Sequence, residues 1–493
     1  MKRIIILILC LCMLLTLFAC GKKDGEVEGE SSGEVTTVQT EGEEVCPLPE
    51  LDYGGRIVTI HVRGDNDSIS EIGLEDTGSH LSGKLYERTV ATEERLNVKL
   101  NIAQGYSWNK YSQTIRDLRT SISAGNGSYD IISGWSARIP VLASEGLFKN
   151  LLDYEYIDTS AEWWSQSMVK STTVNNSLYM ITGDIAATYM DSCFAVLFNM
   201  RLAKSFGYDY SDFYEIVSSG EWTIDYLKTL SMDHYSDETG DGIRNKGDIF
   251  GLSMTAVGSD AFWDSCNISC VKNNGVERPV MEFDIEKVQN VYDKIEELTF
   301  ENKGCLFDAK DDITEMGDVF KDGECLFSIT TLATLANYTD MPDDYGVLPI
   351  PKYDVEQNDY YTHIMYDCSF WSIPIDATAA DVSSAVMTSM GYDSNKTVIE
   401  THYEVLLKTR YVRDSESGYM IDLIYNSISL DFDNIYNEAM GYDLTKKETM
   451  PVYIFRMFAY NKENNASAWW IKNSEPLTAT FNSLVDKFYV TAE

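Results

Sequence analysis

The feature that most constrains the fold is a regular alternation of strand-like and helix-like segments between residues 56 and 133. Alternating or β-branched apolar residues predict strands, and apolar residues three or four positions apart predict helices. These patterns give a strand, a helix, a strand, a helix and a strand, at about 56–62, 83–96, 98–102, 111–122 and 129–133. The order β-α-β-α-β predicts an α/β lobe built on an open sheet.

The end of the third predicted strand indicates where a ligand binds. In open α/β sheets, ligands sit beyond the carboxyl ends of the strands. The segment from Tyr129 to Ser133 ends just before Gly134 and Trp135. We therefore expect these two residues at a binding edge.

A second region of mixed strands and helices follows residue 150. It contains a strand-like run at 194–199 and a helix with apolar residues at Val288, Val291, Ile295 and Leu298. Two more strand-like runs end at prolines, and the C-terminal third reads as mainly helical. We expect two α/β lobes, the first from 51–195 plus about 343–405, and the second from about 196–342 plus 406–493.

The N-terminus has the layout of a signal peptide. Lys2 and Arg3 precede an apolar run, Ile4–Phe18, which is shorter than the roughly 20 residues of a membrane span. Ala19-Cys20 then resembles the lipobox of bacterial lipoproteins, in which the cysteine is acylated and becomes the new N-terminus. We expect residues 1–19 to be a lipoprotein signal peptide. The alternatives are an uncleaved signal anchor and an ordinary secretory peptide.

Residues 20–50 read as an acidic tether between this anchor and the folded body. The segment is rich in Glu, Gly, Ser and Thr and has almost no apolar periodicity, so it has too little apolar surface to form a core. Its position directly after Cys20 predicts a lipid-anchored linker, which places the body on the extracellular face of the cytoplasmic membrane.

Composition and charge limit the partners of the body. Hydrophobic residues make up 44% of 493, which is enough for at least two cores. Lys and Arg total 39 against 78 Asp and Glu, a formal net charge of −39. Such a surface repels nucleic acid and anionic lipid, and it favours a soluble monomer.

The ten cysteines do not predict a disulfide framework. Cys10 and Cys12 leave with the signal peptide and Cys20 carries lipid, so an odd number, seven, remains in the body. Cys266 and Cys270 have no second Cys/His pair at zinc-like spacing. We expect buried free thiols that act as small hydrophobic side chains.

The order of several short motifs resembles that of extracellular solute-binding proteins of ABC importers, and is most similar to the large family 1-like, carbohydrate-type lipoproteins of Gram-positive bacteria. The likeness covers nearly all of the chain after the linker. It rests on the lipobox and on these segments: 129–132 with 142–152, 196–199 with Leu202 and Gly207, Gly220–Thr223, Gly240–Gly242 and Tyr345–Tyr353.

The resemblance implies a fold, a function and partners. The fold is a type II periplasmic-binding-protein-like fold, with two α/β lobes and a hinge. The function is capture of an extracellular solute, a sugar or oligosaccharide, between the lobes and its delivery to ABC permease subunits. The resemblance implies no required cofactor, no catalytic residues and a monomeric protein.

Aromatic and acidic side chains near strand ends are the candidates for sugar contacts. Sugars combine hydroxyl groups with C–H faces, so carboxylates and aromatic rings suit them together. Most aromatic side chains serve a core instead. The candidate ligand-binding residues are Trp135, Asp184, Trp263, Asp367 and Trp371.

The segment from Asp237 to Asp248 has the twelve-residue spacing of a calcium loop. Oxygen-bearing residues occupy positions one, three, five, seven, nine and twelve, and glycine stands at six. Thr239 at position three and Asp248 at position twelve depart from the pattern. The alternative is an acidic solvated turn. The candidate ligands are Asp237, Thr239, Asp241, Ile243 through its carbonyl, Asn245 and Asp248.

Two other functions remain open at this stage. A lipid-anchored glycoside hydrolase needs only two suitably separated carboxylates, which leave little sequence signature among 78 acidic residues. A carbohydrate-binding surface protein without a transporter is the third reading. The sequence has no nucleophile elbow, zinc-protease motif or phosphate loop.

Overall fold

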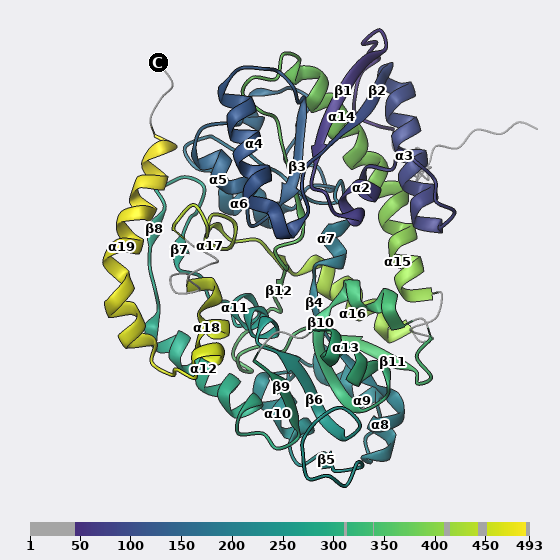
Figure 1. Cartoon of the computed structure of the whole chain (residues 1–493), viewed down its shortest axis with the longest axis vertical. Coiled ribbons are helices and arrows are strands. Elements are labelled where there is room, and N and C mark those ends of the chain that lie inside the picture. Colours follow the sequence, from purple (N-terminus) through teal and green to yellow (C-terminus); the bar gives the residue numbers. More distant parts are fainter. Residues whose placement is uncertain (1–44, 310–312, 339, 409–414, 442–450, 490–493) are drawn as a thin grey trace, which may run out of the picture. The chain divides into compact units, whose positions relative to one another are not determined.

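The first sheet joins the N-terminal strands to one strand from far along the chain (Figure 1). In this computed structural model the described residues are 45–309, 313–338, 340–408, 415–441 and 451–489, and Cys46–Glu493 form one compact unit. The strand order is β13–β3–β1–β2. β1, β2 and β3 are parallel and β13 is antiparallel to β3. Their bounds are β1 (Arg56–Val62), β2 (Val98–Gln104), β3 (Ile131–Trp135) and β13 (Ser369–Ser372).

The core around β1 forms because this strand is covered on both faces at its carboxyl half. Val58, Ile60 and Val62 are fully buried. The neighbouring helices are α3 (His80–Leu96), α4 (Tyr111–Ser123) and α14 (Ala380–Asp393), and α14 packs on α3. A capping box at Ser79 begins α3. The predicted β-α-β-α-β order is confirmed.

The third strand lies two residues later than the sequence predicted. Gly134 and Trp135 were expected just past its end, but both belong to β3. The reason is pairing with β13, in which Ser369 lies opposite Trp135 and Ser372 opposite Ile132. A partner more than 200 residues away in the sequence extends the strand. The local sequence pattern carries no information about such a partner.

The second sheet has six strands in the order β11–β4–β10–β6–β5, with β9 paired to β6. β6 is parallel to β9 and β10, whereas β4 is antiparallel to β10 and β11. The bounds are β4 (Phe194–Asn199), β5 (Tyr235–Ser236), β6 (Ile249–Thr255), β9 (Cys305–Asp308), β10 (Cys325–Thr331) and β11 (Tyr345–Leu348). The predicted strand at 194–199 is confirmed.

The chain passes between the two sheets more than once. It leaves the first sheet after β3, enters the second at β4, and returns from β11 to β13. On the way back, β12 (Thr362–His363) forms a short parallel pair with β14 (Ile428–Ser429), which follows β13 in the sequence. The first lobe was expected to include about 343–405, but β11 lies in this range and pairs with β4 in the second sheet. The limits of the two lobes stay a prediction.

Helices make up most of the remaining structure, including the C-terminal third. No described helix is both long and apolar enough to span a membrane. The bounds are α2 (Asn66–Ile72), α5 (Ile139–Ser144), α6 (Gln166–Thr172), α7 (Thr188–Asp191), α8 (Met200–Ser205), α9 (Ser211–Ser218), α10 (Ile224–Ser231), α11 (Ala261–Ser265), α12 (Ile285–Thr299), α13 (Ile313–Lys321), α15 (Ile399–Lys408), α16 (Ser415–Asn426), α17 (Phe432–Ile435), α18 (Ile454–Asn461) and α19 (Ala466–Lys487), with a hairpin of β7 (Val271–Lys272) and β8 (Val280–Met281).

The cysteines of the body are free thiols, as predicted. Among the described residues seven cysteines are present and none is in a disulfide. Six are buried and Cys46 is partly exposed. Burial raises the pKa of Cys266 and of Cys325 to about 12, so both stay protonated and inert. The signal peptide, Cys20 and the linker as far as residue 44 lie outside the described residues.

Candidate functional site

An aromatic cluster stands at the carboxyl edge of the first sheet. Trp108 follows β2, Trp135 ends β3 and Tyr366 precedes β13. The Trp108 ring stacks on Tyr366 with centroids 4.9 Å apart and meets the edge of Trp135 at 5.6 Å. Trp108 and Tyr366 are partly exposed. Three separate segments therefore build one aromatic surface at the edge where open α/β sheets bind ligands.

Two arginines accompany this cluster. Arg138 follows β3, is 1% exposed, and lies over the rings of Tyr111 at 4.1 Å and Trp108 at 5.0 Å. Its Nη1 is 2.8 Å from Glu438 Oε2, yet Nε and Nη2 have no hydrogen-bond partner among the described residues. Arg63, beyond β1, lies 5.6 Å from the Trp135 ring. Arg138 therefore keeps unused donors in a dry setting.

A third arginine connects this cluster to the second sheet. Arg456 on α18 lies over the rings of Tyr453 at 4.8 Å and Tyr366 at 6.0 Å. Its guanidinium pairs with Asp260, which ends the single 3₁₀ turn after β6. Burial lowers the pKa of Arg456 to about 9, and the paired carboxylate favours the charged form. The edges of the two sheets thus meet through this pair.

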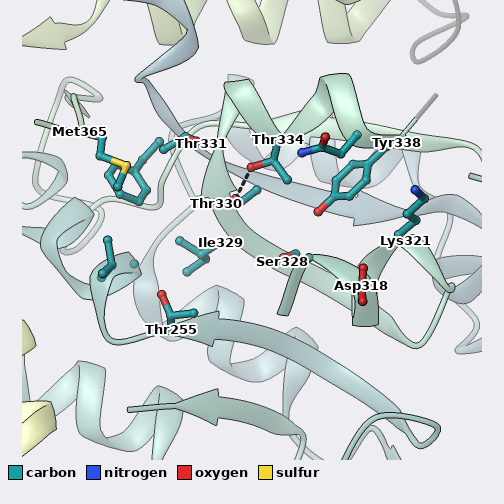
Figure 2. Close-up of a pocket in the computed structure, with 15 residues that line it drawn as sticks. Thr255, Asp318, Lys321, Ser328, Ile329, Thr330, Thr331, Thr334, Tyr338 and Met365 are labelled. Atoms are coloured by element: carbon teal, nitrogen blue, oxygen red, sulfur yellow. Dashed lines mark hydrogen bonds between the residues drawn. The ribbon is translucent and has the colours of Figure 1, made fainter. Parts of the chain in front are cut away.

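A cavity of about 410 Å³ lies at the carboxyl edge of the second sheet (Figure 2). Hydroxyl groups dominate the residues that Figure 2 labels: Thr255, Ser328, Thr330, Thr331, Thr334 and Tyr338. Thr330 and Thr334 share a hydrogen bond of 2.7 Å. The Tyr338 hydroxyl has no hydrogen-bond partner among the described residues, and Figure 2 draws it pointing into the cavity. Asp318 and Lys321 add one carboxylate and one ammonium group, and such a lining suits a polar molecule.

The cavity and the aromatic cluster are continuous along the chain. Met365 lines the cavity, and the next residue, Tyr366, stacks on Trp108. Val257 and Gly258 also line it, and Asp260 two residues later holds Arg456. The aromatic cluster and the hydroxyl-lined cavity are therefore built from neighbouring residues at two points of the chain.

The structure brings only some of the predicted ligand residues to this site. Trp135 lies in the aromatic cluster, and Asp367 is next to Tyr366, where its Oδ1 accepts a hydrogen bond of 2.7 Å from Ser192. Trp371 is fully buried in β13. Trp263 is fully buried in α11 against Phe455, a core setting. Contact of any of these residues with a ligand stays a prediction.

Asp184 lies apart from the aromatic cluster. Its carboxylate accepts hydrogen bonds from the Tyr425 hydroxyl and, at 2.8 Å, from Asn395 Nδ2. The residue is 2% exposed, and this burial raises the pKa of Asp184 to about 6. A ligand role for Asp184 therefore has to be sought at a different cavity.

The sequence reasoning missed Trp108, Arg138, Tyr366 and Arg456. The rule of strand ends could have found Trp108, which stands four residues after β2, and Arg138, which stands three after β3. Arg456 carries no such signal, because it lies on a helix almost 200 residues after Asp260.

The candidate calcium loop folds as a turn that uses its own carboxylates. Asp237 accepts backbone N–H bonds from Gly240 at 2.7 Å and Gly242 at 2.9 Å, and Asp241 accepts one from Ile243 at 2.7 Å. Within the described residues no group of three His, Cys, Asp or Glu side chains is arranged to hold a metal ion. This geometry favours the solvated turn, and calcium binding stays a prediction.

Comparison with known proteins finds likeness in structure and not in sequence. No family model and no curated protein matches the chain. An ABC substrate-binding protein of Listeria monocytogenes, solved with cycloalternan, matches at a TM-score of 0.54 and 12% identity over 87% of this chain and 99% of that one. The GacH receptor of Streptomyces glaucescens, solved with acarbose, gives 0.53 and 13% over 88% and 99%. MalE of Bdellovibrio bacteriovorus, bound to maltotriose, gives 0.51 and 13% over 87% and 100%.

At these identities the likeness establishes the fold. The chain has the α/β fold of maltose-binding-protein-like, type II periplasmic binding proteins, as the sequence resemblance implied. The match extends over nearly the whole length of each of these proteins.

The raised pKa of Asp184 predicts a pH dependence of stability. The folded state binds this proton more tightly than the unfolded state. The contribution of Asp184 to the stability of the fold is therefore greatest below about pH 4 and is lost as the pH rises through about 6. Asp184→Asn should remove up to about 3 kcal/mol of that loss. Urea unfolding of both proteins at several pH values from 4 to 7 measures it, and parallel curves would contradict the shift.

For the acidic loop, we expect millimolar calcium to leave the melting temperature unchanged, because among the described residues no group of three His, Cys, Asp or Glu side chains is arranged to hold a metal ion. Thermal unfolding with and without calcium checks this. A calcium-dependent rise that Asp241→Ala abolishes would instead establish the ion site.

Proposed function

We propose that the chain is the substrate-binding component of an ABC importer and that it captures a carbohydrate between its two sheet edges. The observation that carries the proposal is the aromatic and arginine cluster of Trp108, Trp135, Tyr366 and Arg138 at the edge where this fold class binds ligands. Solved proteins of the same fold are described with cycloalternan, acarbose and maltotriose.

The chemistry of the site suits a sugar. Aromatic faces cover the C–H surface of a pyranose, and guanidinium and hydroxyl groups bond its oxygens. Trp108, which is partly exposed, supplies the first kind of contact, and the unused donors of Arg138 supply the second. The hydroxyl-lined cavity adds room for more than one sugar unit.

No catalytic step belongs to this proposal. The structural neighbours are substrate-binding proteins, which bind and release ligand without breaking bonds. At the site, Arg456 pairs with Asp260 and Arg138 with Glu438. Asp367 accepts a hydrogen bond from Ser192, and Asp318 pairs with Lys246. A hydrolase needs one carboxyl group free to donate a proton.

Sugar binding is the direct test. We expect maltotriose or a related oligosaccharide to raise the melting temperature, because a ligand of the folded state stabilises it by mass action. Trp108→Ala should weaken the affinity at least about twofold to tenfold by calorimetry, since an aromatic contact is worth about 0.5 to 1.5 kcal/mol beyond the area that it buries. Trp470→Ala is the matched control. Trp470 lies on α19 and stacks on Phe283, away from the site.

Four outcomes of this experiment count against the proposal. Cleaved sugar would select the hydrolase, and unchanged affinity in Trp108→Ala would remove the site. Sugar binding without any effect on a co-reconstituted permease would select a surface carbohydrate-binding protein. No thermal shift with any oligosaccharide would remove the carbohydrate assignment.

We also propose that Cys20 carries lipid and holds the protein at the extracellular face of the cytoplasmic membrane. The support is the basic, apolar and small-residue order before Cys20 and the acidic linker after it. Palmitate should label the native chain in cells and not Cys20→Ser, and that variant should leave the membrane fraction. Labelling of Cys20→Ser would contradict the anchor.

A further inference from the structure

A second cavity, of about 230 Å³, surrounds Asp184 and shares no lining residue with the cavity of Figure 2. Its walls come from the segment before α6, from the turn after Thr182, and from the junction of α16 with β14. The volume is below the 300 to 1,000 Å³ or so of pockets for drug-sized ligands. The lining residues are Glu162–Ser167, Gly183, Asp184, Tyr189, Tyr425, Asn426 and Ile428.

Asp184 gives this cavity a buried hydrogen-bond acceptor with unused capacity. The residue is 2% exposed, and one donor reaches each carboxylate oxygen: Tyr425 on Oδ1 and Asn395 on Oδ2. An ionised carboxylate has about four lone-pair sites, so acceptor capacity remains on both oxygens.

Trp164 gives the same cavity a buried donor without an acceptor. Its side chain is 2% exposed, and the indole Nε1–H has no hydrogen-bond partner among the described residues. A buried donor left unpaired costs about 1 to 3 kcal/mol, so an acceptor from outside the chain is favoured at this position. Trp164, with the unmet donor, and Asp184, with the spare acceptor, both line this one small cavity.

The charged and polar groups of this cavity count against an anionic ligand and against a cationic one. An anion would face the carboxylates of Asp184 and Glu162. The same carboxylates would attract a cation, but Glu162 Oε1 already pairs with Lys396 Nζ at 2.7 Å, and a cation would leave the indole N–H of Trp164 unpaired. A hydroxyl group donates to a carboxylate and accepts from an indole N–H at once.

We propose that this cavity is a second binding site, for a small neutral hydroxylated molecule such as a monosaccharide or a polyol. The rings of Trp163, Trp164, Tyr189 and Tyr425 line the space and suit the C–H faces of such a ligand. The assignment does not depend on oligosaccharide capture at the sheet edges, because no residue is common to the two places.

The test follows the indole N–H resonances of the ¹⁵N-labelled full chain during titration with glucose, xylose, myo-inositol and glycerol. Trp164→Phe identifies the Trp164 signal, which we expect to shift in a saturable way with at least one probe. Asp184→Asn should weaken that probe at least tenfold. Asp158→Asn is the matched control, since Asp158 is exposed outside the cavity, and it should change the affinity less than twofold.

Trp108→Ala separates the two sites. It should leave the Trp164 titration unchanged while oligosaccharide binding at the sheet edges is weakened, so either assignment can fail without the other. A Trp164 signal that no probe moves, or equal probe affinity in Asp184→Asn and the native chain, would overturn the second site. Saturation by putrescine or acetate in place of the neutral probes would overturn its ligand class. If Asp184→Asn does not fold, Tyr425→Phe replaces it, with the same tenfold expectation.

Discussion

The pairing of β13 with β3 is the interaction on which the rest of the arrangement depends. Four residue pairs, from Ser369 opposite Trp135 to Ser372 opposite Ile132, bring a late segment of the chain back to the first sheet. This return places Tyr366 against Trp108. It also sets the two-sheet topology, because the chain has already contributed β4 and β11 to the other sheet. Without this ladder the first sheet would end at β3.

Buried charge is the second constraint at the site. Arg138 and Arg456 are almost completely buried, and transfer of an ion out of water costs several kcal/mol. Glu438 and Asp260 offset part of that cost through ion pairs, and aromatic faces offset more through cation–π contacts. Replacement of a buried ion pair by hydrophobic residues of similar volume often leaves the free energy of unfolding unchanged or raises it. The arginines therefore fit better as recognition groups than as core elements.

Local sequence patterns predicted the elements better than the site. The strand at Arg56–Val62 and the helix at Tyr111–Ser123 depend on periodicities of two and 3.6, which the sequence carries directly. Trp371 was predicted as a ligand residue from its strand-like run and Asp184 from its acceptor chemistry, yet the depth of burial of each depends on distant segments. Arg456 reaches the site only through tertiary packing of α18 on the turn after β6. No local pattern encodes that contact.

The absence of disulfides among the described residues has a consequence for the behaviour of the protein in an oxidising medium. Its thermodynamic stability does not depend on the redox potential of the surroundings, because no cross-link can be reduced. The thiols are protected by burial alone, with Cys46 partly exposed. Each unfolding event in an oxidising medium therefore exposes reactive sulfurs that can pair at random, so the lifetime of the molecule there is set by how rarely it opens.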